Sequence, residues 1–173
     1  MSLRPKFHIT GEKGWINDPN GLIYYKGQYH VFFQYYPHAT HWGPMHWGHV
    51  VSKDLIHWDR LPIALYPNND TKEDGCFSGT AIEHENMMYL IYTGFFENGG
   101  GENIRQLQCM ASSLDGVYFQ KHGIIIGEDK LPIEYSACDF RDPKVWKEND
   151  TSYYDVFINR TDYKIVKLCK YIM

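Results

Sequence analysis

The sequence predicts an all-β chain that forms part of a β-propeller. Three observations lead to this prediction: short runs rich in β-branched and aromatic residues, turn residues between the runs, and a unit of about 60 residues that recurs in the same order. No stretch shows the sustained apolar periodicity of a helix. A β-sandwich also has short, regularly spaced strands, but it does not explain why acidic residues recur at the head of the units.

The first unit covers about residues 15–62 and opens with a hairpin. A short turn that contains Gly27 joins its first two runs, and a loop rich in proline and histidine follows them. A third strand then ends at the turn 53–55, and a short fourth strand closes the unit. The four strands are predicted at residues 22–25, 28–35, 47–52 and 57–61.

The second unit covers about residues 76–122 and repeats this order, with strands predicted at 78–82, 87–93, 107–112 and 117–119. A third, partial copy covers about residues 139–173. Strands are predicted in it at 143–146 and 153–158, but the pattern runs out at 165–170, where a third strand belongs. We therefore expect a propeller truncated to about two and a half blades.

Chemically distinctive residues occupy one equivalent place in the three units. The motif WINDPNG at 15–21 places Asp18 at the head of a predicted turn, because Pro presets φ and Asn-Gly tolerates positive φ. Ser78 and Asp142 hold the same place in the second and third units, at the start of the innermost strand. Because the innermost strands of a propeller line its central channel, these three side chains are expected to converge on one small volume.

Composition excludes some functions and favours others. A formal charge of −4 and scattered Lys and Arg give no basic stripe, so no nucleic acid partner is expected. Aromatic residues make up 16% of the chain, which suits strands and also surfaces that contact the apolar faces of sugar rings. The start at residues 1–5 has no apolar leader and no run approaches a membrane span, so we expect a soluble, cytoplasmic protein with no membrane partner.

Cysteine and histidine spacing predicts no metal site. The four cysteines are far apart, form no Cys-x-x-Cys pair and are expected to be reduced: Cys76, Cys109, Cys138 and Cys169. Four histidines have spacings found in zinc sites, but Trp, Gly and Pro separate them in a predicted loop and strand: His38, His41, His46 and His49. The glycines at 99–101 lack the Lys-Ser or Lys-Thr of a phosphate-binding loop. No metal and no cofactor are predicted.

Three motifs occur in order at blade spacing: WINDPNG at 15–21, FSG at 77–79 and FRDP at 140–143. With them, and with the sequences at 34–35, 42–49 and 52–58, the chain resembles glycoside hydrolase family 32, the invertases, sucrose-6-phosphate hydrolases and fructan hydrolases. The resemblance implies a five-bladed propeller followed by a β-sandwich. Residues 1–173 are expected to form the N-terminal portion of that propeller, without the sandwich.

The resemblance also implies an activity, the retaining hydrolysis of a terminal β-D-fructofuranosyl bond, and assigns roles to matching positions. It makes Asp18 the nucleophile that attacks the anomeric carbon of fructose, and Asp142 the transition-state stabiliser. The chemistry agrees, because a retaining enzyme needs an ionised carboxylate at the anomeric carbon and gains from a further fixed negative charge. Arg141 is expected to keep Asp142 ionised by lowering its pKa. The residues implied to bind the sugar are Asn17, Gln34, Trp42, Phe77, Ser78 and Arg141.

Each assignment also has a purely structural alternative. Arg141 and Asp142 can form an ion pair that only stabilises the fold, Gln34 can be an ordinary hairpin residue, and Trp42 can anchor a loop. The ordered set of motifs weighs against these alternatives more than any single residue does.

One catalytic group of the family has no match in the sequence. Retaining fructosidases of this family use a glutamate in a Glu-Cys pair as acid/base, and no Glu-Cys pair occurs in this chain. Neither Glu128 nor Glu134 has the neighbours or blade position of that residue, and Glu134 is interpreted as a loop carboxylate. The chain by itself is therefore expected to be inactive.

Two functions from different classes remain. The first is a β-fructofuranosidase whose acid/base lies outside these residues, with a fructosyltransferase as a variant, because a sugar hydroxyl can replace water as acceptor. The second is a non-catalytic sugar-binding or self-associating half-propeller. Self-association is expected because a partial propeller exposes apolar blade faces at its open ends.

Overall fold

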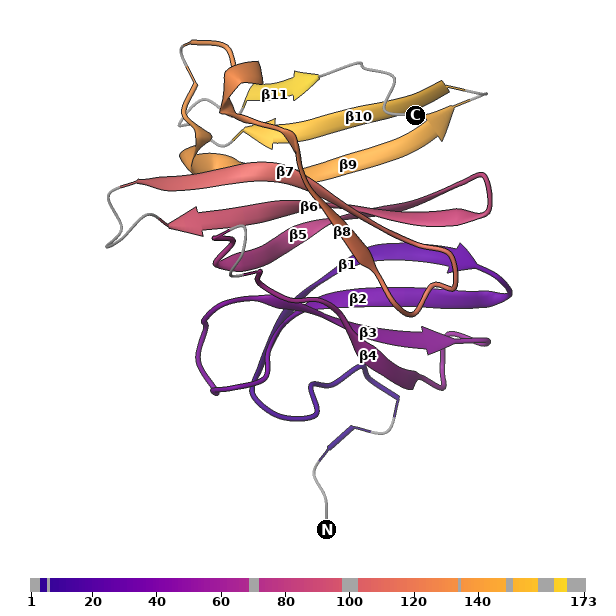
Figure 1. Cartoon of the computed structure of the whole chain (residues 1–173). Helices are drawn as coiled ribbons and strands as arrows, with labels where there is room; N and C mark the ends of the chain where they lie inside the picture. Colours follow the sequence, from indigo (N-terminus) through magenta and orange to yellow (C-terminus); the bar gives the residue numbers. More distant parts are fainter. Residues whose placement is uncertain are drawn as a thin grey trace.

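Three antiparallel sheets stack on one another in chain order (Figure 1). The computed structural model describes residues 4–5, 7–68, 72–97, 103–133, 135–148, 151–158 and 164–167, with side chains described as far as residue 147. Helical structure within these ranges is limited to two short 3-10 turns, η2 (Glu128–Lys130) and η3 (Ala137–Asp139). None of the described helices is long and apolar enough to cross a lipid bilayer. The predicted all-β, partial-propeller fold is confirmed.

The first sheet has the order β1-β2-β3-β4, with β1 (Trp15–Tyr25), β2 (Gln28–Tyr36), β3 (His46–Ser52) and β4 (Asp59–Leu65). The predicted turn at 18–21 is wrong, because these residues lie inside β1. The long partner strand β2 keeps them in the sheet, and two register shifts absorb the irregular backbone. Pro19 is tolerated because β1 is an edge strand. Gly21 has φ +56°, and a Cβ there would lie 2.8 Å from the Phe32 ring.

The second sheet repeats this order, with β5 (Gly75–His84), β6 (Met87–Glu97), β7 (Ile104–Ser113) and β8 (Gln120–Ile126). The third sheet has β9 (Phe140–Glu148), β10 (Thr151–Ile158) and β11 (Lys164–Lys167), in the order β11-β10-β9. A third strand therefore does form where the sequence pattern weakened, although residues 168–170 of that segment lie outside the described residues. The glycines at 99–101 also lie outside them.

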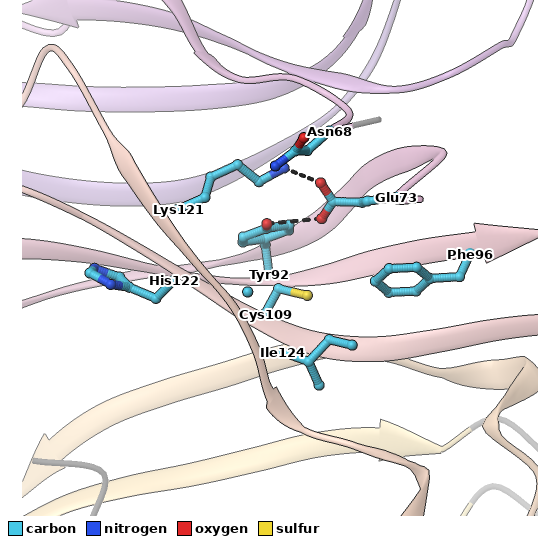
Figure 2. Close-up of a pocket in the computed structure, with 9 residues that line it drawn as sticks. Asn68, Glu73, Tyr92, Phe96, Cys109, Lys121, His122 and Ile124 are labelled. Atoms are coloured by element: carbon cyan, nitrogen blue, oxygen red, sulfur yellow. Dashed lines mark hydrogen bonds and ion pairs between the residues drawn. The ribbon is translucent and has the colours of Figure 1, made fainter. Parts of the chain in front are cut away.

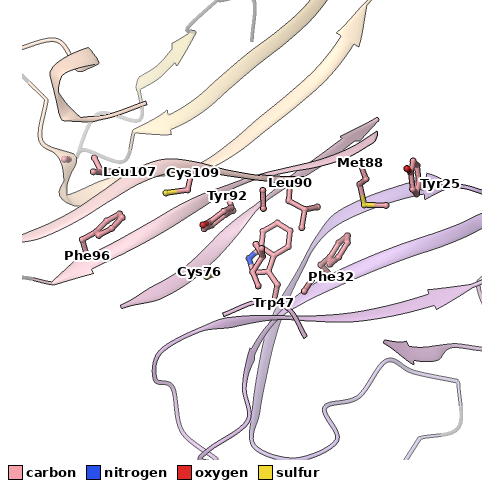
Figure 3. Close-up of a cluster of buried hydrophobic side chains, with 14 residues drawn as sticks. Tyr25, Phe32, Trp47, Cys76, Met88, Leu90, Tyr92, Phe96, Leu107 and Cys109 are labelled. Atoms are coloured by element: carbon pink, nitrogen blue, oxygen red, sulfur yellow. The ribbon is translucent and has the colours of Figure 1, made fainter. Parts of the chain in front are cut away.

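The largest apolar cluster fills the seam between the first and second sheets (Figure 3). Phe32 and Trp47 enter it from the first sheet, and Leu90 and Tyr92 enter it from the second; each is fully buried. A smaller cluster joins the second and third sheets and consists of Ile82, Ile91, Phe140 and Val145. The alternation of side chains along each strand supplies both faces of the second sheet, which is why it can pack on two neighbours.

The outward face of the first sheet has a buried cluster of its own. Val31, Phe33 and Val50 are buried there, with Ile9 and Trp58 packed against them. Residues close to the start of the chain thus cover part of the blade face that was expected to be open. Self-association through open faces stays a prediction.

Candidate active site

The three innermost strands share one irregularity, and it falls at the residues predicted for the site. Asp18, Ser78 and Asp142 have no partner in the strand register, because β1, β5 and β9 each shift register at that point. The shifts lie between Ile16 and Pro19, between Phe77 and Gly79, and between Arg141 and Lys144. A bulge releases a residue from the ladder and changes the direction of its side chain. The predicted equivalence of the three positions therefore has a structural basis.

These three side chains line one open cavity of about 390 Å³. The innermost strands β1, β5 and β9 contact one another, which brings together residues from three sheets. The Ser78 hydroxyl donates to Asp18 Oδ2 at 3.3 Å. A cavity of this size is within the range of small-ligand sites. The remaining wall residues are Pro19, Asn20, Gly21, Leu22, Gly79, Thr80, Pro143 and Lys144.

Asp142 is the most constrained carboxylate of this cavity. Its backbone has φ +57°, in the left-handed region, and its N–H donates to the Thr93 hydroxyl at 3.0 Å. Partial loss of contact with water raises the pKa of the Asp142 carboxyl, whose side chain stays about half exposed; Arg141 lowers this pKa, and the negative charge of Asp18 raises it again. Arg141 therefore acts in the expected direction, but burial outweighs it and the net direction of the Asp142 pKa is upward.

The weak effect of Arg141 has a geometric reason. Its Nε lies 3.8 Å from Asp142 Oδ2, and one of its terminal nitrogens lies 3.8 Å from Asp139 Oδ1. The guanidinium is therefore shared between two carboxylates at the outer limit of an ion pair, and more than a third of its side chain is exposed. Water screens such a pair.

Asn17 and Gln34 lie outside the cavity wall but are held in defined orientations. The Trp15 indole N–H donates to Asn17 Oδ1 at 2.7 Å, which leaves the Asn17 amide N–H groups to point elsewhere. Gln34 is buried, and its side-chain N–H donates to the Cys76 carbonyl at 3.1 Å, two residues before Ser78. The sugar-binding roles of both residues remain predictions.

Trp42 and Phe77 belong to an aromatic row beside the cavity rather than to its wall. The two rings meet edge to face with centroids 6.0 Å apart, and Phe77 stacks on Phe95 at 4.6 Å. Trp42 keeps 52% of its surface exposed, so its ring has a free area on which a sugar can stack. Phe95 was not predicted, and only the fold places it next to Phe77.

Sequence reasoning missed four polar residues in or behind the cavity. Asn20, Thr80 and Lys144 line it, and Thr93 lies behind Asp142. The Asn20 Oδ1 atom is buried and has no hydrogen-bond partner among the described residues. Asn20, Thr80 and Lys144 each lie two positions after a predicted site residue, and this proximity was the signal available in the sequence. Nothing in the sequence around Thr93 indicated its role.

Comparisons with known proteins show the family of the chain. Residues 8–171 match the Glycosyl hydrolases family 32 N-terminal domain. The chain belongs to glycosyl hydrolase family 32. A sucrose-6-phosphate hydrolase of Zymomonas mobilis is 52% identical over 162 residues, which are 92% of this chain and 31% of that protein. A levanase of Bacillus subtilis is 42% identical over 157 residues, 85% of this chain and 22% of that protein.

A solved family 32 structure shows the same similarity in three dimensions. It is a mutant of the Bombyx mori GH32 beta-fructofuranosidase in complex with sucrose, with a TM-score of 0.78 and 42% identity. The match covers 91% of this chain and 33% of that one. This family 32 chain therefore spans a third or less of the length of these relatives.

A second cavity of the family 32 chain, about 270 Å³, contains a buried ion pair (Figure 2). The Lys121 ammonium donates to Glu73 Oε2, and the Tyr92 hydroxyl donates to Glu73 Oε1 at 2.9 Å. Lys121 also donates to the Tyr66 carbonyl at 2.9 Å. Each charged group has partners from more than one segment, as buried charges require. The pair joins β8 to the segment between β4 and β5.

The residues considered for other chemistry give no further site in the described chain. Among the described residues, no group of three or more His, Cys, Asp or Glu is arranged to hold a metal ion. Cys76 and Cys109 are buried free thiols whose pKa burial raises, and Cys138 is exposed; Cys169 lies outside the described residues. Glu128 is exposed in η2, and Glu134 also lies outside the described residues.

Proposed function

We propose that this chain forms the nucleophile side of an active site that cleaves terminal β-D-fructofuranosyl bonds by a retaining double displacement. The observation that supports the proposal best is the convergence of Asp18 and Asp142, from two separate sheets, on one open cavity. Family membership and the activities in the names of the relatives support the same reaction. Sucrose, its 6-phosphate and fructans all present the required bond.

In the first step, a carboxylate oxygen of Asp18 attacks the anomeric carbon of fructose. The bond from that carbon to the leaving oxygen breaks, and the leaving oxygen takes a proton from a general acid. The Ser78 hydroxyl donates to Asp18 and orients the attacking carboxylate. Asp142 accepts hydrogen bonds from sugar hydroxyls and stabilises the positive charge that develops on the ring.

In the second step, water attacks the fructosyl ester and restores Asp18. The group that donates the first proton also removes a proton from this water. Of the described residues that line the cavity, Asp18 and Asp142 are the acidic ones. Both have other roles in this mechanism, so sucrose hydrolysis by these 173 residues alone should be slower by about 10²–10⁴-fold than with a general acid.

Sugar binding tests the proposal without depending on turnover. Fructose should bind weakly and shift the backbone NMR signals of Ser78 and Asp142, whereas glucose should not. Asp142→Ala should remove the fructose response, and Asp74→Ala, a carboxylate outside this cavity, should keep it. Equal responses to fructose and glucose, or fructose shifts confined to other residues, would count against the proposal.

A further inference from the structure

At both seams between sheets, buried side chains of one sheet hydrogen-bond the backbone that leads into the bulge of the next innermost strand. At the first seam, the side-chain N–H groups of Gln34 and Trp47 donate to the carbonyls of Cys76 and Phe77, at 3.1 and 2.9 Å. At each seam the side chains come from the preceding sheet, and the backbone groups that they bond lie at or just before a bulge. Buried side chains of one sheet therefore fix the backbone of the next sheet near its bulge.

At the second seam, side chains of the second sheet bond the backbone of 138–142. Gln108 donates to the Phe140 carbonyl at 2.7 Å, and the Thr93 hydroxyl accepts from the Asp142 N–H at 3.0 Å. Gln106 donates to the Cys138 carbonyl. Alternate residues are thus bonded, as they would be by a neighbouring strand.

The strand register shows that the two seams use equivalent positions. Gln34 lies opposite Trp47 in the pairing of β2 with β3, and Thr93 lies opposite Gln108 in the pairing of β6 with β7. Gln34 and Thr93 thus occupy the same place in successive sheets, as do Trp47 and Gln108. Equivalent positions thus supply the side chains that bond the next sheet at both seams, although Gln34 donates to a carbonyl and Thr93 accepts from an N–H.

The backbone of Asp142 needs such support more than its neighbours do. It has φ +57°, which costs a non-glycine residue free energy, and it precedes Pro143. The bulge also leaves Asp142 without a partner in β10, so the ladder does not bond its N–H. Thr93 is fully buried and supplies an acceptor for that N–H.

We propose that Thr93 is a positioning residue whose hydroxyl fixes the left-handed backbone of Asp142 and so aims the Asp142 carboxyl into the cavity. The importance of this direction for catalysis rests on the proposed function, but the positioning itself does not. Thr93 is not a substrate-contacting residue in this proposal, because Thr93 acts through the backbone N–H of Asp142 and lies outside the cavity wall.

The test compares Thr93→Val, which keeps the shape and removes the hydroxyl, with Thr93→Ser, which keeps the hydroxyl. The readouts are amide hydrogen exchange at Asp142 in the 173-residue chain and fructose binding by NMR. Thr93→Val should speed exchange at Asp142 by about tenfold and weaken fructose binding, while amides of the first sheet stay unchanged. Thr93→Ser should restore both values.

Two results would overturn the proposal: an Asp142 amide that is unprotected in the unsubstituted chain, or equal exchange at Asp142 in both variants. If Thr93→Val does not fold, Thr93→Ala provides the same comparison. Absence of fructose binding by the unsubstituted chain would contradict the proposed function, and the exchange measurement would still decide whether Thr93 positions Asp142.

Discussion

The two seams of this half-propeller contain different kinds of side chain. The first seam holds large rings and a buried ion pair: Trp47 packs on Phe32 and Tyr92, with centroids 5.5 and 6.2 Å apart, and Lys121 binds Glu73. The second seam has a small apolar cluster around Phe140 and a row of polar side chains. The difference indicates that the first seam mainly stabilises the fold, whereas the second mainly sets the position of Asp142.

Equivalent positions show the difference most clearly. Trp47 and Gln108 occupy matching places, and each donates one hydrogen bond to the next sheet. Both side chains are fully buried, but Trp47 adds a large apolar ring to that bond and Gln108 adds a polar amide. Substitutions at the first seam should therefore lower the stability of the whole chain, and substitutions at the second should mostly loosen the third sheet.

The largest effect is expected from Trp47→Ala. It removes a fully buried ring and leaves the Phe77 carbonyl without its donor, so the free energy of unfolding should fall by about 3–5 kcal/mol in urea denaturation. Trp42→Ala is the matched control, because Trp42 is half exposed, and it should change stability by less than about 1 kcal/mol. If the two variants lost the same free energy of unfolding, the claim that the first seam stabilises the fold more than the surface does would fail.

Breaking the ion pair should cost nearly as much. Glu73→Leu leaves the Lys121 ammonium largely buried without its carboxylate, and the free energy of unfolding should fall by about 3 kcal/mol. The double variant Glu73→Leu/Lys121→Met removes both charges and should recover most of this loss. A double variant as unstable as the single one would mean that packing, rather than charge, is responsible.

Acid should weaken the first sheet through a buried histidine pair. Burial lowers the pKa of His49 to about 3, and it also lowers the pKa of His30, whose Nδ1 lies 2.9 Å from His49 Nε2. The unfolded chain binds a proton on each histidine near pH 6.5, and the folded chain binds it only at lower pH, so stability is present at neutral pH and falls as the pH falls.

The expected loss for His49 alone is about 2 kcal/mol between pH 7 and pH 5. His49→Phe should reduce this slope. Denaturation midpoints at the two pH values measure the slope. An unsubstituted chain whose stability is constant over this range would show that the pair is protonated in the folded state.

The smallest effect is expected at the second seam. Gln108→Leu leaves the buried Phe140 carbonyl without this donor, and the free energy of unfolding should fall by about 1–2 kcal/mol. Hydrogen exchange should accelerate mainly in the third sheet, at residues 140–148. Uniform acceleration across all three sheets would contradict the assignment of Gln108 to local positioning.

The repeat and the equivalence of Asp18, Ser78 and Asp142 could be predicted from the sequence, because turn residues and β-rich runs recur with a fixed spacing. The bulge in β1 could not be predicted from the sequence. Its Asp-Pro-Asn-Gly chemistry is typical of a turn, and only the register with β2 shows that the chain continues as a strand.

Contacts between distant segments also could not be predicted from the sequence. Glu73 and Lys121 are 48 residues apart, and Thr93 and Asp142 are 49 residues apart. Neither pair has a local pattern that marks it, since each forms only when the sheets stack. The pKa direction of Asp142 was missed for a related reason: burial and the approach of Asp18 depend on three sheets meeting.

β-D-Fructofuranosyl fluoride tests whether Asp18 is a nucleophile aimed into a fructose site. Fluoride leaves without needing a proton, so Asp18 can form the fructosyl ester without a general acid, and the ester should persist because no base activates water. Intact mass spectrometry should show the addition of one fructosyl group, mapped to the peptide that contains Asp18 and absent in Asp18→Asn. A folded chain that gains no fructosyl group, or gains it at another residue, would contradict the account.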